Sequence, residues 1–125
     1  MDCKDLMIGD WFKAVDYNSP FRITAIYDDV VQTQADYQSE IDGNWYSEAE
    51  IKDLVPIELT EDILEKNGFE KFAESQTLFD YTDNDIHLEY WIGDGCFRYY
   101  TAEIHYVHQL QHLLRLCGIE KELTI

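Results

Sequence analysis

The sequence predicts an α+β fold, in which a small curved antiparallel sheet or SH3-like barrel is followed by a β-meander with two packed helices. Three observations lead to this prediction. Before residue 57, short runs of β-branched and aromatic residues alternate with turn residues. Residues 60–67 have the pattern of a short capped helix. Strand-like alternation at residues 86–92 is followed by a helical pattern at residues 104–117.

Residues 1–57 are expected to form a first, SH3-like or curved-sheet subdomain. Residues 7–15 contain a turn that leads into a strand, and residues 21–27 have the composition of a second strand. A third strand is expected to begin at residue 30. Asp42-Gly43-Asn44 has the composition of a tight turn. Several short strands in so few residues favour a small and strongly curved sheet.

Residues 58–125 are expected to form the second part, which either shares one core with the first or has its own. Thr60 is a favourable N-cap, and Asn67-Gly68 has the composition of a helix end. The C-terminal helix is expected at residues 104–117 because apolar residues recur there at helical spacing. Antiparallel strands are expected between the two helices, at residues 69–72, 77–81, 86–92 and 96–100.

The composition excludes several classes of protein. Hydrophobic residues make up 46% of the 125 residues and aromatic residues 14%, which excludes global disorder. The net charge of −17 argues against direct binding to a nucleic-acid backbone or to an anionic membrane, since both would be repelled. The N-terminus lacks the features of a secretory signal, and no apolar run approaches the ~20 residues of a membrane span. We therefore expect a cytoplasmic protein.

The cysteines predict neither a disulfide framework nor a structural zinc site. Cys3, Cys96 and Cys117 are odd in number and widely spaced, and the chain has no C-x-x-C motif. They are interpreted as reduced thiols. No cofactor is expected.

Three segments together resemble a group of short uncharacterised proteins carried by phages and mobile elements of gut Bacteroidetes. The segments are L-M-I-G-D-W at 6–11, P-I-E-L-T-E-D-I-L-E-K-N-G-F at 56–69 and I-H-Y-V-H-Q-L-Q at 104–111. Those proteins typically read L-R-I-G-N-W-V, P-I-P-L-T-E-E-I-L-x-K-N-G-F and Y-V-H-Q-L-Q-N-L. This chain departs from them at His112, where the group usually has Asn. The resemblance implies a phage or mobile-element setting in a bacterial cytoplasm, and it brings no known activity or functional residue.

Three histidines could carry a metal site on the C-terminal helix. His105, His108 and His112 share one sector of the predicted helix, and the last two have the i, i+4 spacing of helical zinc ligands. This sector lies opposite the apolar stripe and is expected to face solvent or a partner. The alternative is a polar helix face without metal.

The carboxylates do not single out a catalytic pair. The chain has no nucleophile elbow and no phosphate-binding glycine loop. Asp80, Asp83 and Asp85 resemble a calcium loop only loosely, because the glycine and the distal glutamate are missing. An enzyme is therefore not the favoured interpretation. Carboxylates in rows could instead imitate duplex DNA, which carries about one charge per 1.7 Å of axis.

Adjacent aromatic residues predict a protein-binding surface. Neighbours in a strand point to opposite faces, so one of Trp45/Tyr46 and one of Tyr99/Tyr100 should be exposed. Exposed Trp and Tyr are typical of protein interfaces, including homodimer interfaces. The partner-binding candidates are Trp45, Tyr46, Trp91, Tyr99, Tyr100, Asp80, Asp83 and Asp85.

The leading hypothesis is a non-catalytic acidic protein-interaction module of a phage or mobile element. Its partner would be a basic nucleic-acid-binding host enzyme, inhibited by charge mimicry. The alternative is a small metal-binding protein or metal-dependent enzyme that uses the histidine-bearing C-terminal helix. A third hypothesis is an accessory protein whose only partner is a second copy of itself.

Overall fold

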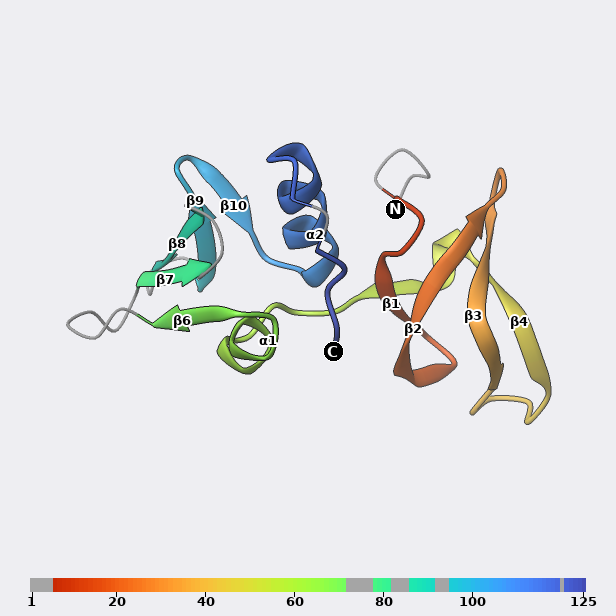
Figure 1. Cartoon of the computed structure of the whole chain (residues 1–125). Coiled ribbons are helices and arrows are strands. Elements are labelled where there is room, and N and C mark those ends of the chain that lie inside the picture. Colours follow the sequence, from red (N-terminus) through yellow and green to blue (C-terminus); the bar gives the residue numbers. More distant parts are fainter. Residues whose placement is uncertain (1–5, 72–77, 82–85, 92–94, 120) are drawn as a thin grey trace.

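The predicted α+β fold with antiparallel sheets is confirmed (Figure 1). The computed structural model describes residues 6–71, 78–81, 86–91, 95–119 and 121–125, and at Ala35, Leu78, Asp80 and Tyr81 the backbone alone. Two five-stranded sheets and two α-helices make up this part of the chain.

The first sheet is curved and open, with the strand order β4-β3-β2-β1-β5. Its edge strands β4 and β5 do not pair with each other within the described residues, so the sheet does not close into a barrel. Register shifts in the β1–β2, β2–β3 and β3–β4 pairs bend the strands. The strands are β1 (Trp11–Ala14), β2 (Tyr17–Ile26), β3 (Val30–Gln38), β4 (Trp45–Glu50) and β5 (Leu54–Pro56), with a 3₁₀ turn at Ile51–Asp53.

The second sheet is the predicted meander, because its strand order β10-β9-β8-β7-β6 follows the chain and every pairing is antiparallel. The alternation predicted at residues 86–92 is seen in β8 (Ile86–Trp91), with Ile86 and Leu88 buried and His87 and Glu89 exposed, and residue 92 lies outside the described residues. The strands are β6 (Phe69–Lys71), β7 (Leu78–Tyr81), β8 (Ile86–Trp91), β9 (Cys96–Tyr99) and β10 (Ala102–Ile104).

Both predicted helices are present, but the second begins later than expected. In α1 (Glu61–Lys66) the Ile63 N–H donates to the Thr60 hydroxyl at 3.3 Å. Gly68 then adopts a φ of 92°, which ends the helix. The second helix is α2 (Val107–Leu116). The expected start at residue 104 is wrong because Ile104 pairs with Phe97 in the β10–β9 ladder.

Buried side chains form two clusters, and α2 lies between the two sheets (Figure 1). The first cluster fills the first sheet and draws on residues from Leu6 to Leu54. The second joins the second sheet, α1, α2 and the C-terminal tail, which we define as residues 121–125. Its largest fully buried side chains are Leu64, Phe69, Phe79, Leu88, Val107, Leu110, Leu114 and Leu123.

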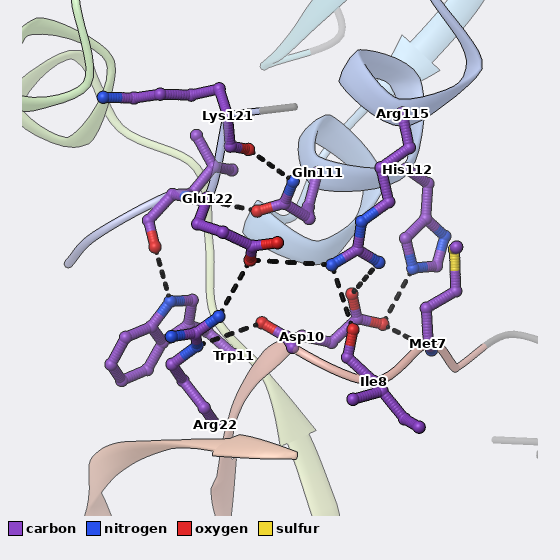
Figure 2. A network of polar contacts seen from close by, with 12 residues as sticks. Met7, Ile8, Asp10, Trp11, Arg22, Gln111, His112, Arg115, Lys121 and Glu122 are labelled. Carbon is purple, nitrogen blue, oxygen red and sulfur yellow. Dashed lines mark hydrogen bonds and ion pairs between the residues drawn. The ribbon is translucent and has the colours of Figure 1, made fainter. Parts of the chain in front are cut away.

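A buried carboxylate ties the first sheet to α2 (Figure 2). Asp10, just before β1, has no exposed surface. Its Oδ2 accepts hydrogen bonds from the Met7 N–H at 2.8 Å and from His112 Nε2 at 2.7 Å. Its Oδ1 lies 3.8 Å from Nη1 of Arg115. Because His112 and Arg115 belong to α2, these contacts fix the helix against the first sheet.

The C-terminal tail links both halves. The Trp11 indole N–H donates to the Leu123 carbonyl at 2.8 Å, which joins the tail to β1 (Figure 2). Gln111 of α2 donates to the Lys121 carbonyl at 2.7 Å and accepts from the Leu123 N–H at 2.9 Å. At the other end of the tail, the buried amide of Asn67 pairs with Thr124.

No helix in the described ranges is both long enough and apolar enough to cross a membrane.

Candidate functional site

A long run of like charge lies on the β2–β3 turn and the β3–β4 hairpin. Between Arg22 and Lys52 the sequence has seven carboxylates and no Lys, Arg or His. All seven residues are exposed. We call residues 28–50 the acidic hairpin; its carboxylates are Asp28, Asp29, Asp36, Glu40, Asp42, Glu48 and Glu50. In Figure 1 it lies at the end of the molecule away from the second sheet.

The acidic hairpin also presents an exposed tryptophan. Trp45 is 66% exposed and begins the edge strand β4. Its neighbour Tyr46 turns toward Tyr37, with ring centroids 6.0 Å apart, and donates its hydroxyl to Asp42 Oδ2 at 2.5 Å. This hydrogen bond is the largest cause of a lowered pKa at Asp42, which favours its charged form. The sequence predicts an exposed member of this pair; Trp45 is the more exposed of the two, and Tyr46 is also exposed, at 37%.

A row of stacked aromatic rings supports the hairpin from inside. Tyr37 is buried, and its ring lies 4.9 Å from that of Tyr17 and 5.6 Å from that of Phe21. Its hydroxyl donates to the Glu48 carbonyl at 3.2 Å. Burial raises the pKa of Tyr37 to about 12, and Asp16 and Asp53 add to the shift. The negative field of the first sheet therefore reaches this phenol.

Replacing Tyr37 by phenylalanine should alter the alkaline limb of the stability profile. A folded-state pKa of about 12 lies above the model value of 10.0, so folding favours the neutral phenol. This contribution is fully present below pH 10 and is lost as the pH rises toward 12. In urea unfolding, Tyr37→Phe should remove part of the decline in stability seen between these two pH values. Tyr27→Phe, at an exposed tyrosine, is the control; equal profiles for the two variants would contradict the expectation.

The other predicted aromatic residues belong to the second sheet, so the aromatic candidates form two separate surfaces. Trp91 is exposed, and the Arg98 guanidinium lies over its ring at 4.5 Å from the centroid. Tyr100 is 85% exposed and has a φ of 54°, a strained value for a residue other than glycine. Tyr99 is half-buried beneath it, and burial raises its pKa. A shallow pocket of about 230 Å³ is lined by His87, Leu88, Glu89, Arg98, Tyr99 and Tyr100.

The acidic candidates of the second part are only partly within the described chain. Asp80 lies in β7, where its backbone pairs with His87. Asp83 and Asp85 lie outside the described residues.

The three histidines do not converge on one point. His108 is buried, and its ring lies 4.8 Å from that of Phe12 in β1. His112 donates to Asp10, and His105 faces Glu103. The expectation that this sector faces solvent or a partner is wrong for His108 because the first sheet covers that side of α2.

A different group brings metal-ligating atoms together. Ligand atoms of Cys96, Glu103 and His105 all lie within 4.8 Å of one another. It is the one such group in the described part of the chain. The sequence pattern does not reveal this group, because residues 102 and 103 are not predicted as a strand and residue 104 is predicted to begin the C-terminal helix, whereas β10 places Glu103 opposite Arg98 of β9.

No protein-family model matches the chain, and neither does any curated protein or solved structure. Fold and site together define an α+β protein with an acidic, tryptophan-bearing hairpin at one sheet edge.

Proposed function

We propose that the chain is a non-catalytic protein-interaction module whose acidic hairpin binds a basic face of a nucleic-acid-binding enzyme and keeps nucleic acid from that face. One observation carries the proposal. Seven exposed carboxylates lie on one turn and one hairpin that also carries the exposed Trp45, and the one cation paired with them in the described chain is Lys52, 3.1 Å from Glu50. A surface of this kind offers charge complementarity for long-range attraction and an aromatic anchor for affinity.

Several carboxylates of the acidic hairpin make no stabilising contact within the described chain and are available to a partner. The carboxylates of Asp36, Glu40 and Glu48 form no hydrogen bond or ion pair within the described residues. Like charges that lie on one exposed surface lower the folding free energy gain through mutual repulsion. A basic partner would relieve this repulsion on binding.

The proposal also includes an origin in a phage or mobile element. The resemblance to short proteins of phages and mobile elements of gut Bacteroidetes supports a role against a host enzyme in the bacterial cytoplasm. Inhibitors of restriction and other nucleic-acid enzymes benefit such elements, and a small acidic protein can occupy a groove that otherwise holds DNA.

Neutralising the hairpin should weaken partner binding about tenfold. Asp36→Asn, Glu40→Gln and Glu48→Gln are nearly isosteric, and each exposed ionic contact is worth about 0.5 kcal/mol, so three together give about one order of magnitude. The control carries Asp62→Asn, Glu65→Gln and Glu70→Gln, three exposed carboxylates of the second part. Both triple variants have the same net charge, so a difference between them reports position.

The experiment is capture from a gut Bacteroidetes lysate on the immobilised chain, read by mass spectrometry, with and without competing duplex DNA. The proposal expects a nucleic-acid-binding enzyme that the original chain and the control retain, that the hairpin variant loses, and that DNA displaces. Equal capture by the two triple variants, capture that resists DNA and high salt, or no capture would overturn it.

A single substitution separates the anchor from the charge. Trp45→Ala should weaken binding of the captured partner by about 30-fold if Trp45 is a buried anchor in the complex. Tyr100→Ala, at the exposed aromatic residue of the second sheet, should leave binding unchanged. The reverse result would move the interface to the second sheet.

A further inference from the structure

Three side chains of different chemistry meet on the outer face of the second sheet. Cys96 begins β9, Glu103 lies in β10, and His105 follows β10 directly. Their ligand atoms lie within 4.8 Å of one another. They lie within nine positions of one another in sequence, yet no familiar metal-binding motif describes them.

The strand register explains why they meet. In the β9–β10 pair Phe97 lies opposite Ile104 and Arg98 opposite Glu103. Continuing this antiparallel register by one residue brings His105 opposite Cys96. Alternate residues share a face. Phe97 and Ile104 therefore enter the core, whereas the three ligating side chains share the other face.

The donor set is that of zinc. Thiolate, imidazole and carboxylate are the three side-chain donors that Zn²⁺ uses, whereas Mg²⁺ and Ca²⁺ prefer oxygen alone. Ligand distances of about 2.0–2.3 Å in a tetrahedral site put neighbouring donor atoms about 3.3–3.8 Å apart. The ligand atoms, which lie within 4.8 Å of one another, therefore need to approach by only about 1–1.5 Å to reach the spacing of a zinc site. The Glu103 and His105 side chains are 49% and 41% exposed, so small side-chain rotations can bring the donor atoms to these distances.

The surroundings orient the ligands. Cys96 is 2% exposed, and in the described chain its thiol has no hydrogen-bond partner. Arg98 Nη2 donates to Glu103 Oε1 at 3.2 Å, while Glu103 Oε2 lies 3.5 Å from His105 Nε2. The arginine thus holds one carboxylate oxygen and leaves the other toward the cysteine and histidine, as outer-shell partners of metal ligands do.

We propose that Cys96, Glu103 and His105 bind one Zn²⁺-class divalent transition-metal ion, with water completing the coordination. Binding converts the Cys96 thiol to a thiolate, and its proton passes to solvent. The site is independent of the acidic hairpin, and it uses only the first of the three histidines of the original metal hypothesis.

The test is titration of the reduced, untagged full chain with Co²⁺ alone, followed by displacement with Zn²⁺. A cysteine-ligated cobalt site gives a thiolate-to-metal charge-transfer band in the near ultraviolet. We expect one Co²⁺ per chain, loss of that band in Cys96→Ser, and at least about tenfold weaker binding in His105→Ala and Glu103→Gln. Cys117→Ser, which removes an exposed thiol, is the control and should keep the band.

The variants also separate misfolding from loss of a ligand. Cys96 is buried, so Cys96→Ser is checked by circular dichroism, while the partly exposed His105 gives a second test that does not depend on the core. A band that survives in Cys96→Ser, a band that disappears in Cys117→Ser, unchanged affinity in His105→Ala, or no stoichiometric cobalt binding would each overturn the proposal. Partner capture by the acidic hairpin does not require metal. Failure of the metal proposal would therefore leave capture by the metal-free chain unchanged, and it is distinguishable from failure of the proposed function.

Discussion

Substitution of Asn67 by alanine is expected to lower the free energy of unfolding by about 3 kcal/mol. The Asn67 side chain is fully buried, and its Nδ2 donates to the carbonyls of Ile63 and Thr124, both at 2.7 Å. Its Oδ1 accepts from the Thr124 N–H at 2.8 Å and from the Thr124 hydroxyl at 3.3 Å. Alanine leaves these groups unpaired and opens a cavity between α1 and the C-terminal tail.

Urea unfolding followed by tryptophan fluorescence and circular dichroism measures this effect. Asn18→Ala, at an exposed asparagine in β2, is the matched control and should change stability by less than about 0.5 kcal/mol. A loss below about 1 kcal/mol for Asn67→Ala would show that the tail contributes little to the second core.

Removal of the buried carboxylate at Asp10 should have a comparable effect. Breaking a buried charge pair from one side costs about 3–5 kcal/mol. The side chains of His112 and Arg115 are 24% and 22% exposed, so water partly compensates them and the lower end, about 3 kcal/mol, is expected for Asp10→Ala. The variant also loses the acceptor that holds the Met7 N–H.

A double-mutant cycle isolates the contact between the two halves. Asp10→Ala and His112→Ala are combined, and a coupling of at least about 1 kcal/mol is expected from their 2.7 Å hydrogen bond. Asp29→Ala, at an exposed carboxylate in the β2–β3 turn, controls for the loss of one negative charge. Additive effects of the two junction substitutions would mean that the hydrogen bond contributes no stability.

Local patterns in the sequence predict most of the helices and strands. Thr60 and Gly68 mark the two ends of α1 because capping depends on groups within one turn of the helix. The alternation from Ile86 predicts β8 because the side chains of a strand alternate between core and solvent. Both signals are short-range, and both survive in the folded chain.

Contacts between distant segments could not be derived in this way. The histidine sector of α2 has a polar composition, and nothing within the helix indicates that Phe12 covers His108. The pairing of Asp10 with His112 depends on how α2 packs against the first sheet. The Cys96, Glu103 and His105 group depends on a strand register that becomes visible only once residues 102–104 are recognised as β10.

The position of Leu123 and Asn67 bears on how the chain folds as it leaves the ribosome. Within the described residues, the apolar cluster of the first sheet ends at Leu54, so its own side chains are all synthesised before α2, which later covers Phe12 with His108. The second core includes Leu123, and Asn67 finds its partners only in the tail. The nascent second half therefore exposes apolar surface until residues 121–125 emerge, and during that interval we expect it to need protection by chaperones.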